Sequence, residues 1–139
     1  MTEKLQVLIL CTANSARSQM GEGLLRNMAG DRFDVYSAGS EPSVVNPYAV
    51  RVMAEEGIDI SRHTSKNLTI YLEKEFDYVI TVCDNAARNC PHFPGKAVRI
   101  HWSLVDPADA GHSDEECMKS FRNARDRLKN CLQEWVKAV

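Results

Sequence analysis

The amino-acid sequence predicts an open α/β sheet with helices on both faces. Short apolar runs that resemble buried strands alternate along the chain with segments of helical periodicity. The first run, Leu5–Leu10, is continuous except for one Gln, as expected for a parallel strand buried on both sides. The final segment, Ser113–Val139, repeats apolar residues at three- and four-residue steps. The chain has 139 residues, so we expect a single domain over 1–139.

Three further strands follow the first along the chain. Phe33–Ala38 ends before the turn residues of "GSEP", and Tyr78–Val82 is rich in β-branched residues. Ala97–His101 is a shorter run. The residues between these strands are long enough for crossover helices, so the strands are expected to form one sheet.

Helices are predicted between the strands and at the end of the chain. Ser15 or Ser18 is expected to cap the first helix. Ser113 and the acidic residues after it supply a cap and negative charge at the start of the last helix. The predicted helices are Ser18–Ala29, Pro47–Gly57, Leu68–Phe76 and Ser113–Val139.

Composition excludes several classes of protein. Hydrophobic residues make up 44% of the chain and charged residues 26%, as in ordinary globular proteins. The net charge of -2, without a basic cluster, argues against a nucleic-acid-binding face. No apolar stretch has transmembrane length and no signal-peptide pattern is present, so a cytoplasmic location and no membrane partner are expected. In a reducing compartment the five cysteines are not expected to form a disulfide framework.

Reactive side chains follow three of the predicted strands. Cys11 comes directly after the first strand, Cys83 follows Tyr78–Val82, and Asp106 lies in a loop after the last strand. Ligands of open α/β sheets bind beyond the carboxyl ends of the strands. The three side chains are therefore expected at one rim of the sheet.

The segment "CTANSARS" has the features of an anion-binding loop. It joins a strand to a helix N-terminus, where backbone N–H groups and the helix dipole favour negative charge. Arg17 can grip a tetrahedral oxyanion with two donors, and Asn14 tolerates a left-handed backbone. The same positive field stabilises a Cys11 thiolate, to which Ser18 can donate. We call the predicted oxyanion-binding residues the cradle: Thr12, Ala13, Asn14, Ser15, Ala16, Arg17 and Ser18.

The spacing from Cys11 to Arg17 alone also fits a buried strand-end cysteine followed by a surface arginine. The strand before the loop and the helix after it favour the anion site. A nucleotide-binding loop is not expected, because the chain lacks the Gly-Lys-Ser/Thr sequence at this turn.

Several segments together resemble a known family. They are "LCTANSARSQMGEG", "SAGSEP", "NPYAVRVMAEEGIDISRHTSKNL", "DYVITVCDNAARNCP" and "HWSLVDPAD". The chain resembles the low-molecular-weight protein tyrosine phosphatase fold, and more closely the arsenate reductases of that fold that draw electrons from thioredoxin. The resemblance implies an open four-stranded parallel sheet flanked by helices on both faces.

The resemblance also implies a relay of three thiols. Cys11 attacks arsenate, Cys83 then forms a disulfide with Cys11, and Cys90 forms the final disulfide with Cys83. The polar stretch between Cys83 and Cys90 is expected to be a loop that moves to let the two sulfurs meet. Packing cysteines, or a metal site that also uses His92 and His101, are the alternatives, but the spacing matches no zinc pattern.

Other residues receive roles from the same resemblance. Asp106, held before Pro107, is the expected general acid or base. The phosphatases usually have tyrosines after this Asp-Pro pair, whereas Ala108, Asp109 and Ala110 follow here, which favours a small inorganic oxyanion.

Cys117 and Cys131 are expected to be small buried packing residues of the last helix.

Related reductases hold a monovalent cation near the cradle, and this chain departs from their pattern. Asn14, Glu22 and Ser37 match three of the expected ligands, but the fourth position is Lys66. We therefore expect the Lys66 ammonium to replace the cation. His63 and His101 are expected to be structural rather than catalytic.

The function predicted from sequence is reduction of arsenate to arsenite for detoxification, with no bound cofactor and no metal. The expected partners are arsenate, phosphate or sulfate as competing anions, and thioredoxin, which the spacing of Cys83 and Cys90 favours over glutathione or mycothiol systems. A monomer is expected. A tyrosine phosphatase of the same fold is the alternative, and a thiol-based arsenite or redox sensor is a weaker one because no DNA-binding face is evident.

Overall fold

The four predicted strands form one parallel sheet. A computed structural model of the chain describes residues 3–109 and 113–139. The sheet has the order β2-β1-β3-β4, and every neighbouring pair of strands is parallel. Its strands are β1 (Leu5–Cys11), β2 (Phe33–Gly39), β3 (Tyr78–Thr81) and β4 (Val98–His101). The predicted strands are confirmed to within one residue at each end.

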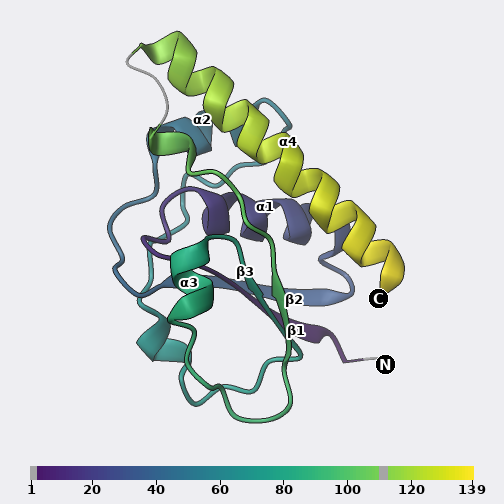
Figure 1. Ribbon diagram of the computed structural model, residues 1–139. Coiled ribbons are helices and arrows are strands. Elements are labelled where there is room, and N and C mark those ends of the chain that lie inside the picture. The colour runs from purple at the N-terminus through teal and green to yellow at the C-terminus, as the bar shows by residue number, and fades with distance from the viewer. Residues whose placement is uncertain (1–2, 110–112) are drawn as a thin grey trace.

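Helices cover both faces of this sheet, as predicted. The α-helices are α1 (Arg17–Ala29), α2 (Pro47–Ala54), α3 (Asp84–Arg88) and α4 (Asp114–Ala138). In Figure 1 α4 runs diagonally across the molecule beside α1 and α2, and these three helices contact one another. None of the helices in the described ranges has the length and apolarity needed to cross a bilayer.

Alternating side chains of the strands divide the core into two layers. Phe33 of β2 packs against Trp135 of α4, with ring centroids 5.1 Å apart. Tyr36 points to the opposite face and meets Tyr71 at 5.5 Å and Phe76 at 5.7 Å. The α1–α4 layer therefore lies on one face, and an aromatic cluster lies on the other.

The predicted helix Leu68–Phe76 is wrong over most of its length. Only a 3₁₀ turn, η1 (Leu68–Tyr71), forms there, and the Asn67 side chain caps it by accepting from Thr69 N. The chain then turns so that Phe76 is buried between Tyr36 and Phe93. The side chain of Asp77 also accepts from the backbone of Gln6 at 2.7 Å. These contacts outweigh the helical propensity of the segment.

Two other predictions about helices need correction. Neither Ser15 nor Ser18 caps α1, since the N-cap is Ala16 and no side chain bonds to the cap position. The polar stretch after Cys83 is not a loop, because Asp84–Arg88 forms α3 with Cys83 as its N-cap. In contrast, Ser113 caps α4 by accepting from Glu116 N, as predicted.

Candidate active site

A hollow lies at the rim of the sheet, beyond the carboxyl end of β1 and beside the first turn of α3. It is a cavity of about 470 Å³. Cys11 is at its base, and Arg17 and Asp106 also contribute to its wall. Of the three side chains expected at one rim, Cys11 and Asp106 line this cavity, whereas Cys83 does not. The full lining is Cys11, Thr12, Ala13, Ser15, Ala16, Arg17, Glu41, Asn85, Asp106 and Ala108.

The sulfur of Cys11 is buried and receives polar contacts from the cradle. Asn14 N donates to Cys11 Sγ at 3.2 Å, and Ser18 Oγ lies 2.8 Å from the same sulfur. Ser18 is fully buried, so its hydroxyl supports the sulfur from below rather than lining the cavity. Hydrogen bonds of this kind, at the start of a helix, favour a thiolate nucleophile.

Asn14 fixes the shape of the cradle. Its φ of 48° is the left-handed conformation predicted for this position. Its side chain is fully buried and donates to Ser18 Oγ at 2.7 Å and to Ser37 Oγ at 3.0 Å. Its carbonyl oxygen Oδ1 accepts from Gln19 at 2.9 Å and from Lys66 N at 2.8 Å. Asn14 is thus a buried support of the cradle and does not line the cavity.

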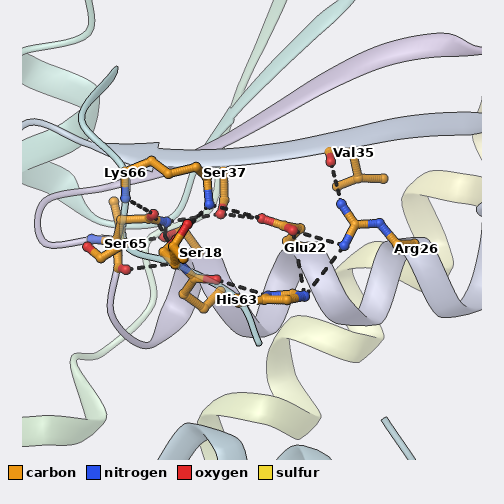
Figure 2. A network of polar contacts seen from close by, with 12 residues as sticks. Ser18, Glu22, Arg26, Val35, Ser37, His63, Ser65 and Lys66 are labelled. Atoms are coloured by element: carbon orange, nitrogen blue, oxygen red, sulfur yellow. Dashed lines mark hydrogen bonds and ion pairs between the residues drawn. The ribbon is translucent and has the colours of Figure 1, made fainter. Parts of the chain in front are cut away.

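A buried carboxylate lies beneath the cradle. Ser37 Oγ donates to Glu22 Oε1 at 2.5 Å, and Arg26 pairs with Glu22 Oε2 at 2.9 Å (Figure 2). Lys66 Nζ lies 3.7 Å from Glu22 Oε1 and donates to Thr64 O at 2.7 Å. The Lys66 ammonium therefore lies beside Glu22, and its replacement of a cation stays a prediction.

Burial also affects the titration of the groups around Glu22. Burial lowers the pKa of His63, which disfavours the imidazolium, and Glu22 acts in the opposite direction. Burial likewise lowers the pKa of Lys66, again opposed by Glu22. His63 Nδ1 lies 3.0 Å from Gln19 Oε1, which makes His63 part of the support under the cradle, as expected for a structural histidine.

Arg17 and Asp106 are held together at the wall of the cavity. Arg17 Nη1 donates to Leu104 O at 2.9 Å, and its Nη2 lies 3.6 Å from Asp106 Oδ2. Asp106 Oδ1 accepts from Ala108 N at 3.0 Å, so the turn at Pro107 fixes the carboxylate. The side chain of Asp109 and the whole of Ala110, which follow the Asp-Pro pair, lie outside the described residues.

Cys83 lies next to the cradle, on the same side of the sheet rim as Cys11. Its Sγ is 3.4 Å from Thr12 Oγ1, and Ala86 N donates to it at 3.4 Å. Asn85 Nδ2 donates to Thr12 Oγ1 at 2.9 Å, which ties α3 to the cradle. All five cysteines are free, and Cys83 is buried.

Cys90 is separated from this cavity. It lies in a smaller hollow of about 150 Å³ with Ala87 and His101 among its lining residues. Burial raises the pKa of its thiol, and Arg99 acts in the opposite direction. The structure therefore brings Cys11 and Cys83 to one rim but leaves Cys90 in a separate hollow just beyond the end of α3.

The two remaining cysteines lie on α4. Cys117 and Cys131 are only partly buried, so the expectation of buried packing residues holds in part. Within residues 3–109 and 113–139, no group of three His, Cys, Asp or Glu side chains is arranged to hold a metal ion.

Two cavity residues were missed by the sequence analysis. Glu41 belongs to the "SAGSEP" segment, but nothing in its spacing assigned it a role. Asn85 lies in the stretch expected to be a loop. A predicted α3 beginning at Cys83 would have put Asn85 in the first turn of the helix, close to the rim.

Comparison with known proteins identifies a family and several relatives of this chain. Residues 6–139 match the family model of the low molecular weight phosphotyrosine protein phosphatases. An arsenate reductase of Halalkalibacterium halodurans is 48% identical over 122 residues, which are 88% of each chain. A solved arsenate reductase in a phosphate-binding state superimposes with a TM-score of 0.83 at 30% identity, over 97% of this chain and 98% of that one. A thioredoxin-dependent arsenate reductase of Corynebacterium glutamicum gives a TM-score of 0.74 at 30% identity, over 99% of this chain and 62% of that one.

Proposed function

Because the chain belongs to the low molecular weight phosphotyrosine protein phosphatase family, we propose that it uses this family's cysteine cradle to reduce arsenate to arsenite. The observation that carries the proposal is the pair of thiols at one rim. Cys11 lies at the base of the cavity, and the Cys83 sulfur is 3.4 Å from the cradle residue Thr12. A phosphatase needs only the first of these thiols, whereas a reductase needs a second thiol to supply electrons.

The first step is attack of the Cys11 thiolate on arsenate held in the cradle. A sulfur–arsenic bond forms, and one arsenic–oxygen bond breaks. A proton delivered through Asp106 lets that oxygen leave as water, and arsenic remains pentavalent. Arg17 neutralises charge on the remaining oxygens, and its contact with Asp106 keeps the acid beside the leaving oxygen.

The second step reduces the arsenic. The Cys83 thiolate attacks the Cys11 sulfur and forms a Cys11–Cys83 disulfide. The sulfur–arsenic bond breaks, its electron pair stays on arsenic, and trivalent arsenite leaves. The Cys90 thiolate then attacks the Cys83 sulfur, which forms the Cys83–Cys90 disulfide and releases Cys11 as a thiolate.

The third thiol requires α3 to unwind. Cys83 is the N-cap of α3, the helix ends at Arg88, and Cys90 lies two residues beyond that end in a separate hollow. A disulfide needs its two Cα atoms within about 7 Å and its two sulfurs in direct contact. In this proposal α3 unwinds to let the two sulfurs meet, and its unwinding carries the oxidised pair away from the cavity toward a protein reductant.

The reductant in this proposal is thioredoxin, and the enzyme acts as a cytoplasmic monomer with no bound cofactor. The similarity to a thioredoxin-dependent arsenate reductase supports the reductant. The similarity to a reductase in a phosphate-binding state supports phosphate as a competing anion. Slow hydrolysis of aryl phosphates is expected as a side activity, because the same cradle accepts a phosphoryl group.

The test compares two activities in the same set of variants. Thioredoxin-dependent arsenate reduction should fall by at least about 100-fold in Cys83→Ser and Cys90→Ser, because each lacks a sulfur that a step requires. Aryl phosphate hydrolysis should persist in both and be lost in Cys11→Ser. Cys131→Ser, a partly buried cysteine of α4, is the matched control and should keep both activities.

Two outcomes would contradict the proposal. Arsenate reduction at the wild-type rate by Cys83→Ser would exclude the relay. A wild-type protein that reduces no arsenate with thioredoxin or any other dithiol donor would exclude the activity itself.

A further inference from the structure

His101 contacts the chain on both sides of Cys83. It is the last residue of β4. Its Nδ1 lies 2.7 Å from Thr81 Oγ1 and 3.2 Å from Thr81 O. Its Nε2 lies 2.9 Å from Asp84 Oδ1. Thr81 ends β3 and Asp84 begins α3, so one imidazole spans the short segment that has Cys83 at its centre.

The chemistry of the two partners fixes the direction of these bonds. An ionised carboxylate only accepts hydrogen bonds, so Nε2 of His101 carries a hydrogen and donates to Asp84. The pKa of Asp84 is held below its ordinary value first by the hydrogen bond from His101 and then by one from Ser103. In the neutral ring, Nδ1 accepts from the Thr81 hydroxyl, and in the protonated ring it donates to Thr81. The bond to Asp84 is therefore present in both forms of the imidazole.

Hydrogen bonds of this kind are needed to hold α3 in place, because the helix buries little apolar surface. It has five residues, and Ala86 is its buried one. A helix this short is not stable without contacts to the rest of the protein. The contacts of its first turn include the Asp84–His101 bond, the bond from Asn85 to Thr12 and the bond from Ala86 N to Cys83.

We propose that His101 is a positioning residue for Cys83. Its bonds to Thr81 and Asp84 hold Cys83 beside the cradle in the dithiol state, and the bond to Asp84 is lost when α3 unwinds. This inference rests on the proposed relay. It extends the relay by assigning a role to a residue outside the cavity, and by linking β4 to the redox state of the Cys83–Cys90 pair.

A bond that exists only in the dithiol state has a measurable consequence. Reduction of the Cys83–Cys90 disulfide by an external dithiol transfers two electrons and two protons and restores α3. If the Asp84–His101 bond forms at the same time, it favours reduction and raises the potential of the pair. Removing the bond therefore makes the pair harder to reduce.

The experiment measures the equilibrium of this pair in full-length Cys11→Ser protein with dithiothreitol buffers, followed by thiol trapping and mass spectrometry. Asp84→Ala and His101→Ala should each lower the equilibrium constant for reduction by about tenfold, which is about 30 mV for a two-electron couple. The double variant should change by less than the sum of the two single effects, because both substitutions remove the same Asp84–His101 bond. His101→Gln, whose side-chain amide can donate to Asp84, should restore part of the effect.

The matched control is Asp114→Ala. Asp114 is also an acidic residue in the first turn of a helix and pairs with Arg51 at 2.8 Å, but it belongs to α4. This variant should leave the potential of the Cys83–Cys90 pair unchanged. A shift equal to that of Asp84→Ala would overturn the proposal, since it would reflect general electrostatics.

Three other results would also overturn it: an unchanged potential in His101→Ala, additive effects in the double variant, or equal losses of thermal stability in the dithiol and disulfide forms. The measurement uses no arsenate. Its failure is therefore distinct from a failure of the proposed activity, which would appear as a wild-type protein that does not reduce arsenate.

Discussion

Asn14 shapes the cradle with both its backbone and its side chain. Its left-handed conformation turns the loop over Cys11, and its amide group links the loop to β2 and to the segment before η1. Gly39 has a complementary role, because a Cβ at this position would collide with the carbonyl oxygen of Thr12. The two residues explain why the loop after β1 and the end of β2 can approach so closely.

Replacing Lys66 with Asp should allow a bound potassium ion to take the place of the lysine ammonium. The wild-type ammonium lies 3.7 Å from Glu22, so Lys66→Asp removes one positive charge and adds a carboxylate beside the existing one. An oxygen-rich pocket of this kind favours a bound metal cation. We expect the thermal stability and arsenate reduction of Lys66→Asp to rise with KCl relative to choline chloride at constant ionic strength.

Wild type and Lys137→Asp should show no such difference between the two salts. Lys137 is an exposed lysine of α4, so its replacement makes the same change of charge far from the cradle. If Lys66→Asp responds to potassium no more than these two proteins do, the ammonium does not stand in for a cation.

At the scale of whole elements, burial decides how far sequence predicts structure. The helices α1, α2 and α4 are predictable because each buries an apolar face with helical period, and β1 and β3 because they are short runs of buried apolar residues, whereas β4 is mostly exposed. The short helix α3 has no such period, since Ala86 is its buried residue, and polar contacts define it instead. Those contacts come from residues distant in sequence, such as His101 and Thr12, so no local pattern reveals them.

The same reasoning applies to the candidate site. Cys11, Cys83 and Asp106 follow strand ends, and the topology of a parallel sheet is sufficient to bring such positions together. The contributions of Glu41 and Asn85 to the cavity wall depend on the path of a loop and on an unpredicted helix. Sequence therefore predicts the reacting groups better than the residues that surround them.

The packing of α2 against α4 depends on a pH-sensitive ion pair. Glu55 at the end of α2 accepts from Arg122 at 2.7 Å and from Arg125 at 2.8 Å. Hydrogen bonds from Arg122 and then Arg125 lower the pKa of Glu55 from its ordinary 4.5 to about 2. Because the folded pKa is the lower one, the stabilisation is complete above pH 4.5 and is lost as the pH falls toward 2.

Glu55→Gln should therefore unfold at a lower temperature than wild type at neutral pH. The difference in unfolding temperature should shrink as the pH falls from 4.5 toward 2. Thermal unfolding of both reduced proteins between neutral and acidic pH measures this difference. Glu134→Gln, which removes an exposed pair with Lys137, should follow the wild-type curve closely. A Glu55→Gln curve parallel to that of wild type over the whole range would show that the pair contributes nothing to stability.

Across the whole molecule, burial is distributed unevenly around the site. Val7, Leu8 and Ile9 of β1 and Leu25 of α1 are fully buried. The helix α3 is held mainly by hydrogen bonds instead. Segments with few buried apolar contacts open at a lower free energy than the core. Redox change at Cys83 and Cys90 can thus unwind α3 while the sheet and the α1–α4 layer stay folded.

Hydrogen exchange of the dithiol and disulfide forms tests whether α3 unwinds while the sheet and the α1–α4 layer stay folded. Formation of the Cys83–Cys90 disulfide should speed exchange of the amides in 84–90 by at least about tenfold, because their helical hydrogen bonds are lost. Amides of β1 and α1 should exchange equally slowly in both forms, since they belong to the core that positions Cys11. Faster exchange throughout β1 would mean that oxidation loosens the whole protein. Unchanged exchange in 84–90 would mean that the disulfide forms without unwinding α3, and the proposed movement of the third thiol would then be wrong.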